Sequence, residues 1–258
     1  TRLFRAVRFE ERYHFRMDPH TEALARHAIE SDALAAISPE RIRAELRHIV
    51  HEPRPVGALL RLDDLGVLRW ICPNLELDRP FLQRVPSVLD WWQEHAKDKV
   101  SRLCVYLAAI LAPVGLPAAL ECAERKLRIT GPDLRRIESA LQALAAAPGL
   151  LNPDDLPSEI TRRLRPLPPE ALVILRAWTL TAGEDAASRE AVLERFVVRW
   201  RNVKLEVTGD ELLRAGHRPG PHLGRALART LDAKLNGELH SHAEELAYVR
   251  RLLELGVP

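Results

Sequence analysis

Four arginines recur at helical spacing in the first segment of the chain. Arg2, Arg5, Arg8 and Arg12 are three or four residues apart, so a helix gathers them along one stripe. Guanidinium groups match phosphate oxygens in bidentate geometry, and such a stripe suits a triphosphate or an RNA backbone. The same spacing fits a solvated helix face that two neighbouring glutamates partly neutralise. The residues alone leave both interpretations open.

A second basic cluster lies near the C-terminal end, around Gly220. The proline that follows this glycine begins a helix whose first backbone N–H groups are free, which makes an anion site. The cations around it are His217, Arg218, His222 and Arg225. An RNA phosphate fits such a site. A tight corner between two helices is the alternative, and the residues favour neither. Asp210, upstream, is expected to cap a helix rather than to bind a metal.

The Ser38-Pro39-Glu40-Arg41 segment predicts a helix start, with Ser38 as N-cap and Pro39 in the first turn. Glu40 and Arg41 are ordinary residues for such a start. The expected buried face of this helix consists of Ile42, Leu46, Ile49 and Val50.

Three segments resemble class II tRNA nucleotidyltransferases and bacterial poly(A) polymerases. Residues 1–19 are similar to the end of that family's nucleotide-selecting helix and the start of its neck. Residues 37–46 resemble the next neck element, a Ser-x-Glu-Arg-Ile start. Residues 208–224, with Gly-Asp-Glu-Leu and Arg-Pro-Gly-Pro, resemble the tail of bacterial CCA-adding enzymes. With the neck ending at residues 62–73, the matches span residues 1–73 and about 205–240, a little under half of the chain.

For the neck, the resemblance implies nucleotide binding by Arg2 and Arg5. Arg2 matches the arginine that, together with an aspartate, reads the Watson–Crick edge of ATP or CTP. That aspartate is expected to precede residue 1. Glu40, Arg41 and Glu45 are expected to brace the nucleotide-selecting helix through salt bridges and packing.

For RNA, the resemblance implies binding of the tRNA acceptor and elbow, or of another RNA 3′ end. The residues expected to make these contacts are Arg8, Arg12, His217, Arg218, Gly220, His222 and Arg225. No DNA partner and no membrane partner are expected. A stand-alone helical interaction or regulatory module, without transferase activity, is the alternative.

Catalysis in this family depends on a head domain with a Gly-Ser turn and a metal-binding Asp-x-Asp strand. The sequence contains neither a Gly-Ser dipeptide nor an Asp-x-Asp pattern. We therefore expect no catalytic residue, metal site or cofactor in this chain, and a catalytic head missing from its N-terminal side. ATP or CTP and Mg²⁺ would serve the complete enzyme. The order of addition (CCA, A only, or poly(A)) stays open.

The elements that must position these residues are predicted to be helices throughout, in an elongated all-α array without a regular repeat. We expect a neck over 1–75, a helical body over 76–150 and a helical tail over 151–258. One helix is predicted over 55–68, a proline-rich loop around Pro73, Pro80 and Pro86, and three helices over 88–147. Leu24, with Ala28 and Ile29, is expected to face the core.

Composition describes an ordinary cytoplasmic protein. Hydrophobic residues make up 47% and charged residues 29% of the chain, and the net charge of +2 favours no polyanion by itself. No apolar run reaches the ~18–20 residues of a membrane span. Cys72, Cys104 and Cys122 form no Cys-x-x-Cys pair, so buried free thiols are expected, with no disulfide and no zinc.

Overall fold

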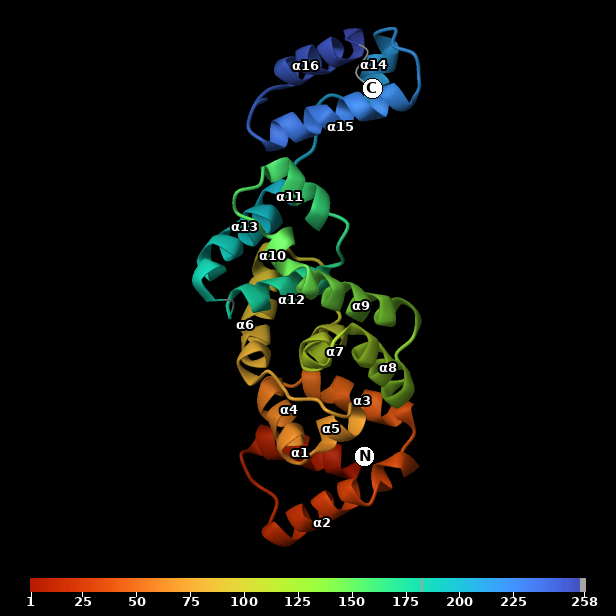
Figure 1. Ribbon diagram of the computed structural model, residues 1–258, viewed down its shortest axis with the longest axis vertical. Helices are drawn as coiled ribbons and strands as arrows, with labels where there is room; N and C mark the ends of the chain where they lie inside the picture. The colour runs from red at the N-terminus through yellow and green to blue at the C-terminus, as the bar shows by residue number, and fades with distance from the viewer. Residues whose placement is uncertain (182, 256–258) are drawn as a thin grey trace. The chain divides into compact units, whose positions relative to one another are not determined.

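The computed structural model describes residues 1–181 and 183–255, and within these ranges every regular element is a helix (Figure 1). The all-α prediction is confirmed. The last three residues of the predicted tail lie outside the described ranges.

The chain forms two compact units. Unit 1 contains Thr1–Ala147 and Leu167–Ala187, and unit 2 contains Pro148–Pro166 and Ser188–Pro258. The division into neck, body and tail stays a prediction. The helices of unit 1 are α1 (Arg2–Tyr13), α2 (Pro19–Glu30), α3 (Pro39–Val50), α4 (Pro55–Asp64), α5 (Val67–Ile71), α6 (Arg79–His95), α7 (Arg102–Leu111), α8 (Leu116–Leu127), α9 (Gly131–Ala145) and α12 (Pro169–Thr179).

Unit 2 holds the remaining α-helices of the described residues, with α10 and α13 beginning at its borders. They are α10 (Ala147–Leu150), α11 (Pro157–Leu164), α13 (Ala186–Val198), α14 (Gly209–Arg214), α15 (Pro221–Leu235) and α16 (His242–Glu254). Helix α15 packs against α11, α14 and α16. The core of this last part is built from Val207, Leu212, Leu223, Ala226 and Val249.

The core of unit 1 is centred on α7. All of its residues from Leu103 to Leu111 are buried. A helix that is apolar on every side has to be surrounded by others, and α3, α6, α9 and α12 pack around it. Helix α3 contributes the four residues predicted from its sequence, Ile42, Leu46, Ile49 and Val50.

N-cap residues and prolines mark where several helices begin. Asp18 is the N-cap of α2, and its carboxylate accepts hydrogen bonds from the backbone N–H groups of His20 (3.0 Å) and Thr21 (3.1 Å). Ser38 is the N-cap of α3 with Pro39 in the first turn, as predicted, although its hydroxyl makes no capping bond. Thr208, and not Asp210, is the N-cap of α14.

Three of the predicted boundaries are wrong. Pro80 and Pro86 lie inside α6, because its buried face at helical spacing runs through them and packing outweighs the hydrogen bond that Pro86 removes. The helix predicted over 55–68 is split into α4 and α5 by Gly66, whose φ of 90° is left-handed. The proline- and glycine-containing turn at 112–115 also separates α7 from α8, giving four helices in place of three.

The expectation for α2 is also wrong. This helix has no buried residue, and Leu24 is 55% exposed. Its attachment is polar instead: Nη1 of Arg26 donates to the backbone carbonyl of Asp64 at 2.8 Å, and Glu22 pairs with Arg61 of α4. The helical spacing of apolar residues in this segment therefore does not mark a buried face.

The cysteines differ from the prediction as well. Cys72, just after α5, and Cys122, on α8, form a disulfide with a Cα–Cα distance of 5.4 Å, whereas Cys104 is free and buried. The pair is 50 residues apart in sequence. Its formation depends on the packing of α5 against α8, which residue spacing cannot indicate.

Candidate nucleic-acid interface

Helix α1 carries its arginines outward because its apolar residues point inward. Phe4 and Val7 are fully buried, whereas Arg2 and Arg5 are exposed. The predicted nucleotide-binding pair therefore lies on an open face of unit 1.

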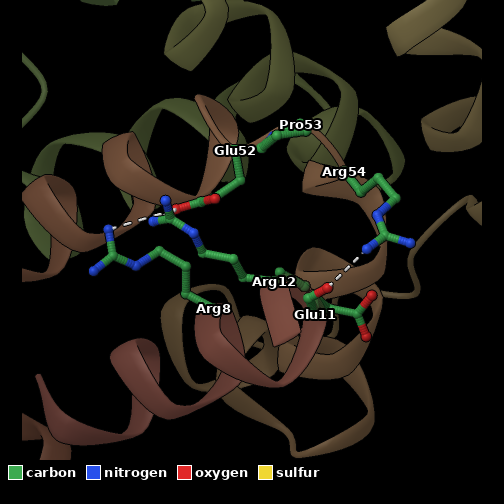
Figure 2. Close-up of a pocket in the computed structure, with 7 residues that line it drawn as sticks. Arg8, Glu11, Arg12, Glu52, Pro53 and Arg54 are labelled. Carbon is green, nitrogen blue, oxygen red and sulfur yellow. Dashed lines mark hydrogen bonds and ion pairs between the residues drawn. The ribbon is translucent and has the colours of Figure 1, made fainter. Parts of the chain in front are cut away.

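Arg8 and Arg12 share a carboxylate that lies outside their own helix. Oε1 of Glu52, in the loop between α3 and α4, is 3.7 Å from Nη1 of Arg8 and 3.7 Å from Nη1 of Arg12. Figure 2 shows both guanidinium groups turned toward it. The side chain of Arg8 is 17% exposed and that of Arg12 is 52% exposed, so Arg12 is the more accessible of the two.

The opening around these residues is small. Arg54 reaches it from the same loop and donates from Nη2 to the backbone carbonyl of Glu11 at 3.2 Å (Figure 2). The cavity measures about 60 Å³, far less than the roughly 300–1,000 Å³ of small-molecule pockets. It therefore suits a phosphate oxygen, an ion or water at its mouth, and not a whole nucleotide.

The two glutamates of α1 have other partners than the arginine stripe. Glu10 is buried, and its carboxylate accepts from Nε of Arg61 at 3.1 Å and from the backbone N–H of Met17 at 2.6 Å. Glu11 pairs with Arg16 at 2.9 Å. The stripe is thus neutralised by a loop residue, and Glu10 instead fixes α1 to α4.

This contact extends to α2 through Glu22. Hydrogen bonds from Arg61 and then from Arg26 lower the pKa of the Glu22 carboxyl to about 2, against a small opposing effect of burial. The pKa of Arg61 is raised, chiefly by its hydrogen bond to Glu22. Three helices around the N-terminal end of unit 1 are therefore held together by charge-assisted hydrogen bonds.

The predicted bracing residues lie at the start of α3. Glu40 pairs with Arg128, at the end of α8, at 3.6 Å, so this ion pair joins α3 to α8. Arg41 and Glu45 lie close to Thr1, the residue before α1, and α3 packs against α1. These two residues therefore lie near the first turn of α1.

The second basic cluster lies at the start of α15 in unit 2. Gly220 is the N-cap and Pro221 occupies the first turn. A Cβ at Gly220 would lie 2.8 Å from Nδ1 of His222, so the glycine makes room for the imidazole. Arg218, His222 and Arg225 are exposed and His217 is half-buried, which leaves the cluster open to an anion.

The described residues offer no metal centre. They contain no group of three or more His, Cys, Asp or Glu side chains placed to hold a metal ion. Among these residues no helix is both long and apolar enough to cross a bilayer.

Comparison with known proteins gives the relationship. Residues 14–78 match a family model described as "Probable RNA and SrmB-binding site of polymerase A". The A-adding tRNA nucleotidyltransferase of Geobacter sulfurreducens is 32% identical over 264 residues, which cover 98% of this chain and 29% of that protein. The chain is thus similar, over nearly its whole length, to an A-adding tRNA nucleotidyltransferase.

Two further relatives extend the comparison. The A-adding tRNA nucleotidyltransferase of Halalkalibacterium halodurans is 27% identical over 97% of this chain and 55% of its own length. The Thermotoga maritima CCA-adding enzyme complexed with tRNA has the same fold, with a TM-score of 0.81, 22% identity, and coverage of 98% of this chain and 60% of that one. The chain thus spans between about a third and three fifths of these relatives.

Within the family match, the structure brings together residues that the motifs did not single out. Glu52, Arg54 and Arg61 all contact α1, although they lie about 40 to 50 positions from it in sequence. The sequence signals that mark them are weak: a charged residue at a helix end and one arginine on α4. Their role depends on how α3 and α4 pack against α1.

Proposed function

We propose that this chain is the RNA-binding and nucleotide-selecting portion of an enzyme that adds nucleotides to RNA 3′ ends, with tRNA as its principal substrate. The similarity to an A-adding relative over 98% of the chain carries this proposal. A tRNA substrate implies a cytoplasmic location.

The roles divide between the two units. In unit 1, Arg2 and Arg5 on the open face of α1 contact the incoming ATP or CTP, and the Glu10–Arg61 contact holds that helix in place. Arg8 and Arg12 contact RNA phosphates. Arg41 and Glu45 support the start of α1.

In unit 2, the start of α15 binds an RNA phosphate. Backbone N–H groups at a helix start attract anions, and the accompanying guanidinium and imidazole groups add charge-assisted hydrogen bonds. The contact residues are His217, Arg218, Gly220, His222 and Arg225. Neither arginine of this cluster forms an ion pair among the described residues, so both are available.

The transfer step itself is proposed to need residues beyond these 258. Metal-assisted nucleotidyl transfer requires clustered carboxylates for Mg²⁺, and the described residues provide no such cluster. This chain alone is therefore expected to bind RNA without extending it.

A paired substitution tests the tail contact. Changing Arg218 and Arg225 to Ala should weaken tRNA binding and reduce the slope of log affinity against log salt by about 0.9 per lost phosphate contact. Arg250 and Arg251, exposed on α16, provide a charge-matched double variant that should leave the slope unchanged. Equal effects of the two double variants would contradict the assignment.

A protein-binding neck is a second candidate. Around the start of the matched region 14–78, Tyr13 is 63% exposed, Phe15 48% and Leu24 55%, so these apolar side chains are accessible to a protein partner. This reading predicts that Phe15→Ser and Leu24→Ser leave the tRNA affinity unchanged. A loss of tRNA affinity would assign the same surface to RNA.

A further inference from the structure

The loop of residues 51–54 is close to cations from two other helices, all within unit 1. Glu52, in this loop, pairs with Arg8 and Arg12, each at 3.7 Å. Nε of Arg102, on α7, donates at 2.8 Å to the backbone carbonyl of Val50, just before the loop. The Cα atoms of residues two positions apart are at most about 7 Å from each other. Guanidinium groups from α1 and α7 therefore contact this short segment of chain, and Arg54 is part of the loop.

Arg102 also belongs to a second, larger opening. A cavity of about 300 Å³ lies where α6 ends and α7 begins, with Leu89, Trp92 and Val100 as its apolar lining and Lys97, Lys99 and Arg102 as its cations. Among the described residues Lys97 and Lys99 are exposed and form no ion pair. Asp98 is the one carboxylate in this lining, so the opening keeps a net positive charge.

The backbone at Lys97 is unusual. Lys97 follows α6 in the left-handed region, with φ of 62°, and its N–H bonds to the carbonyl of Trp92 at 3.3 Å. Glycine is the usual residue at such a helix end, because a Cβ is disfavoured in this conformation. Lys97 is exposed and has no ion partner among the described residues, so its cation is accessible to an anionic ligand.

We propose that Lys97, Lys99 and Arg102 continue the RNA surface that begins at Arg8 and Arg12. The phosphates of one RNA strand would pass from α1 across the loop of residues 51–54, beside Arg54, to the end of α6. The proposal rests on the proposed function and assigns unit 1 an RNA contact beyond α1.

The arrangement suits a polyanion more than a small phosphate. A single phosphate is held by donors that converge on it, whereas these cations come from α1, a loop, the end of α6 and α7. Cations spread along a surface, contributed by flexible lysines, are typical of backbone contacts to nucleic acid. Inorganic triphosphate presents the same anionic phosphate oxygens as RNA, so separate titrations are needed to distinguish the two ligands.

Lys97→Gly gives the sharpest test. This change relieves the left-handed strain, so the thermal midpoint should stay or rise, while the affinity for tRNA falls about threefold at moderate salt. Arg128→Gly is the matched control: Arg128 ends α8 with φ of 50°, carries one exposed positive charge and pairs only weakly with Glu40 at 3.6 Å. The Arg128→Gly variant should likewise relieve the left-handed backbone strain, and it should leave the tRNA affinity unchanged.

The double change of Lys97→Gly with Lys99→Gln extends this test to the salt dependence. The tRNA affinity of the unaltered chain should fall between about 50 and 200 mM salt. With two phosphate contacts removed, this fold loss of affinity should be about tenfold smaller. An unchanged salt dependence, with normal RNA binding by the unaltered chain, overturns the proposal and leaves the proposed function intact. Failure of the unaltered chain to bind any RNA overturns both.

The same proteins titrated with inorganic triphosphate separate the two ligand sources. We expect weak binding that Lys97→Gly barely changes. Tight triphosphate binding that depends on Lys97, together with RNA binding that does not, would assign the opening to a small phosphate ligand and overturn the RNA surface.

Discussion

At the scale of single residues, Glu10 shows how the arginine-rich helix is held. Its side chain is fully buried, and Arg61 and the N–H of Met17 both donate hydrogen bonds to its carboxyl group. A buried carboxylate of this kind is stable only with its partners. It keeps α1 in one orientation, so the arginines on the opposite side stay exposed.

Replacing Glu10 with Gln tests that role. The amide keeps the volume but removes the charge that Arg61 faces, so the free energy of unfolding should fall by about 2 kcal/mol. Glu121→Gln is the control, because Glu121 forms an exposed i,i+4 pair with Arg125, and such pairs contribute roughly 0.5 kcal/mol or less. Thermal unfolding of the two variants measures the difference, and similar losses would contradict a special role for Glu10.

The pH dependence of the same contact follows from Glu22. Its pKa is lowered from 4.5 to about 2 by Arg61 and Arg26. A depressed carboxyl pKa stabilises the folded state above pH 4.5, and that contribution disappears as the pH falls toward 2. An NMR titration of the Glu22 carboxyl should find its pKa well below 4.5. Arg26→Ala should raise this pKa but leave it below 4.5, because Arg61 remains; an ordinary pKa in the unaltered chain would contradict the contact.

Some of these residues were predictable and others were not. The arginine stripe follows directly from spacing, and so does its exposure opposite Phe4 and Val7. The carboxylate that neutralises Arg8 and Arg12 was not predictable, since Glu52 is 40 residues or more away and reaches them only through the packing of the α3–α4 loop. Local charge patterns pointed instead to Glu10 and Glu11, which have other partners.

At the scale of elements, the sequence predicts helix starts better than helix continuity. Asp18-Pro19 and Ser38-Pro39 carry local capping and proline signals, and α2 and α3 begin at those prolines. The prolines predict a loop around Pro86, whereas α6 tolerates this proline because of its buried face, which only the surrounding helices define. The polar attachment of α2 is likewise a tertiary feature.

The cysteines give a prediction at this scale. Under non-reducing conditions the unfolded chain should show one reactive thiol, from Cys104, because Cys72 and Cys122 are bonded. In the folded chain Cys104 should not react near neutral pH, since burial raises its pKa to about 11. Thiol titration before and after unfolding measures both counts. Three reactive thiols in the unfolded, unreduced chain would contradict the disulfide between α5 and α8.

At the scale of the whole molecule, the chain supplies helical surfaces, and its described residues contain no group of three or more His, Cys, Asp or Glu side chains placed to hold a metal ion. Each unit carries exposed cations: α1 and the end of α6 in unit 1, and the start of α15 in unit 2. The net charge of +2 does not reveal these cations, because acidic residues elsewhere in the chain balance most of the positive charge. The motifs therefore indicate the function class, whereas the composition does not.

The most direct measurement is a competition titration of the 258-residue chain with full-length tRNA, against an unrelated RNA hairpin of equal length, at several salt concentrations. The account predicts that tRNA binds more tightly than the hairpin, and that its affinity falls steeply with salt as phosphate contacts are screened. Equal binding of the two RNAs, or no salt-dependent binding of either, would contradict the claim that these helices recognise tRNA.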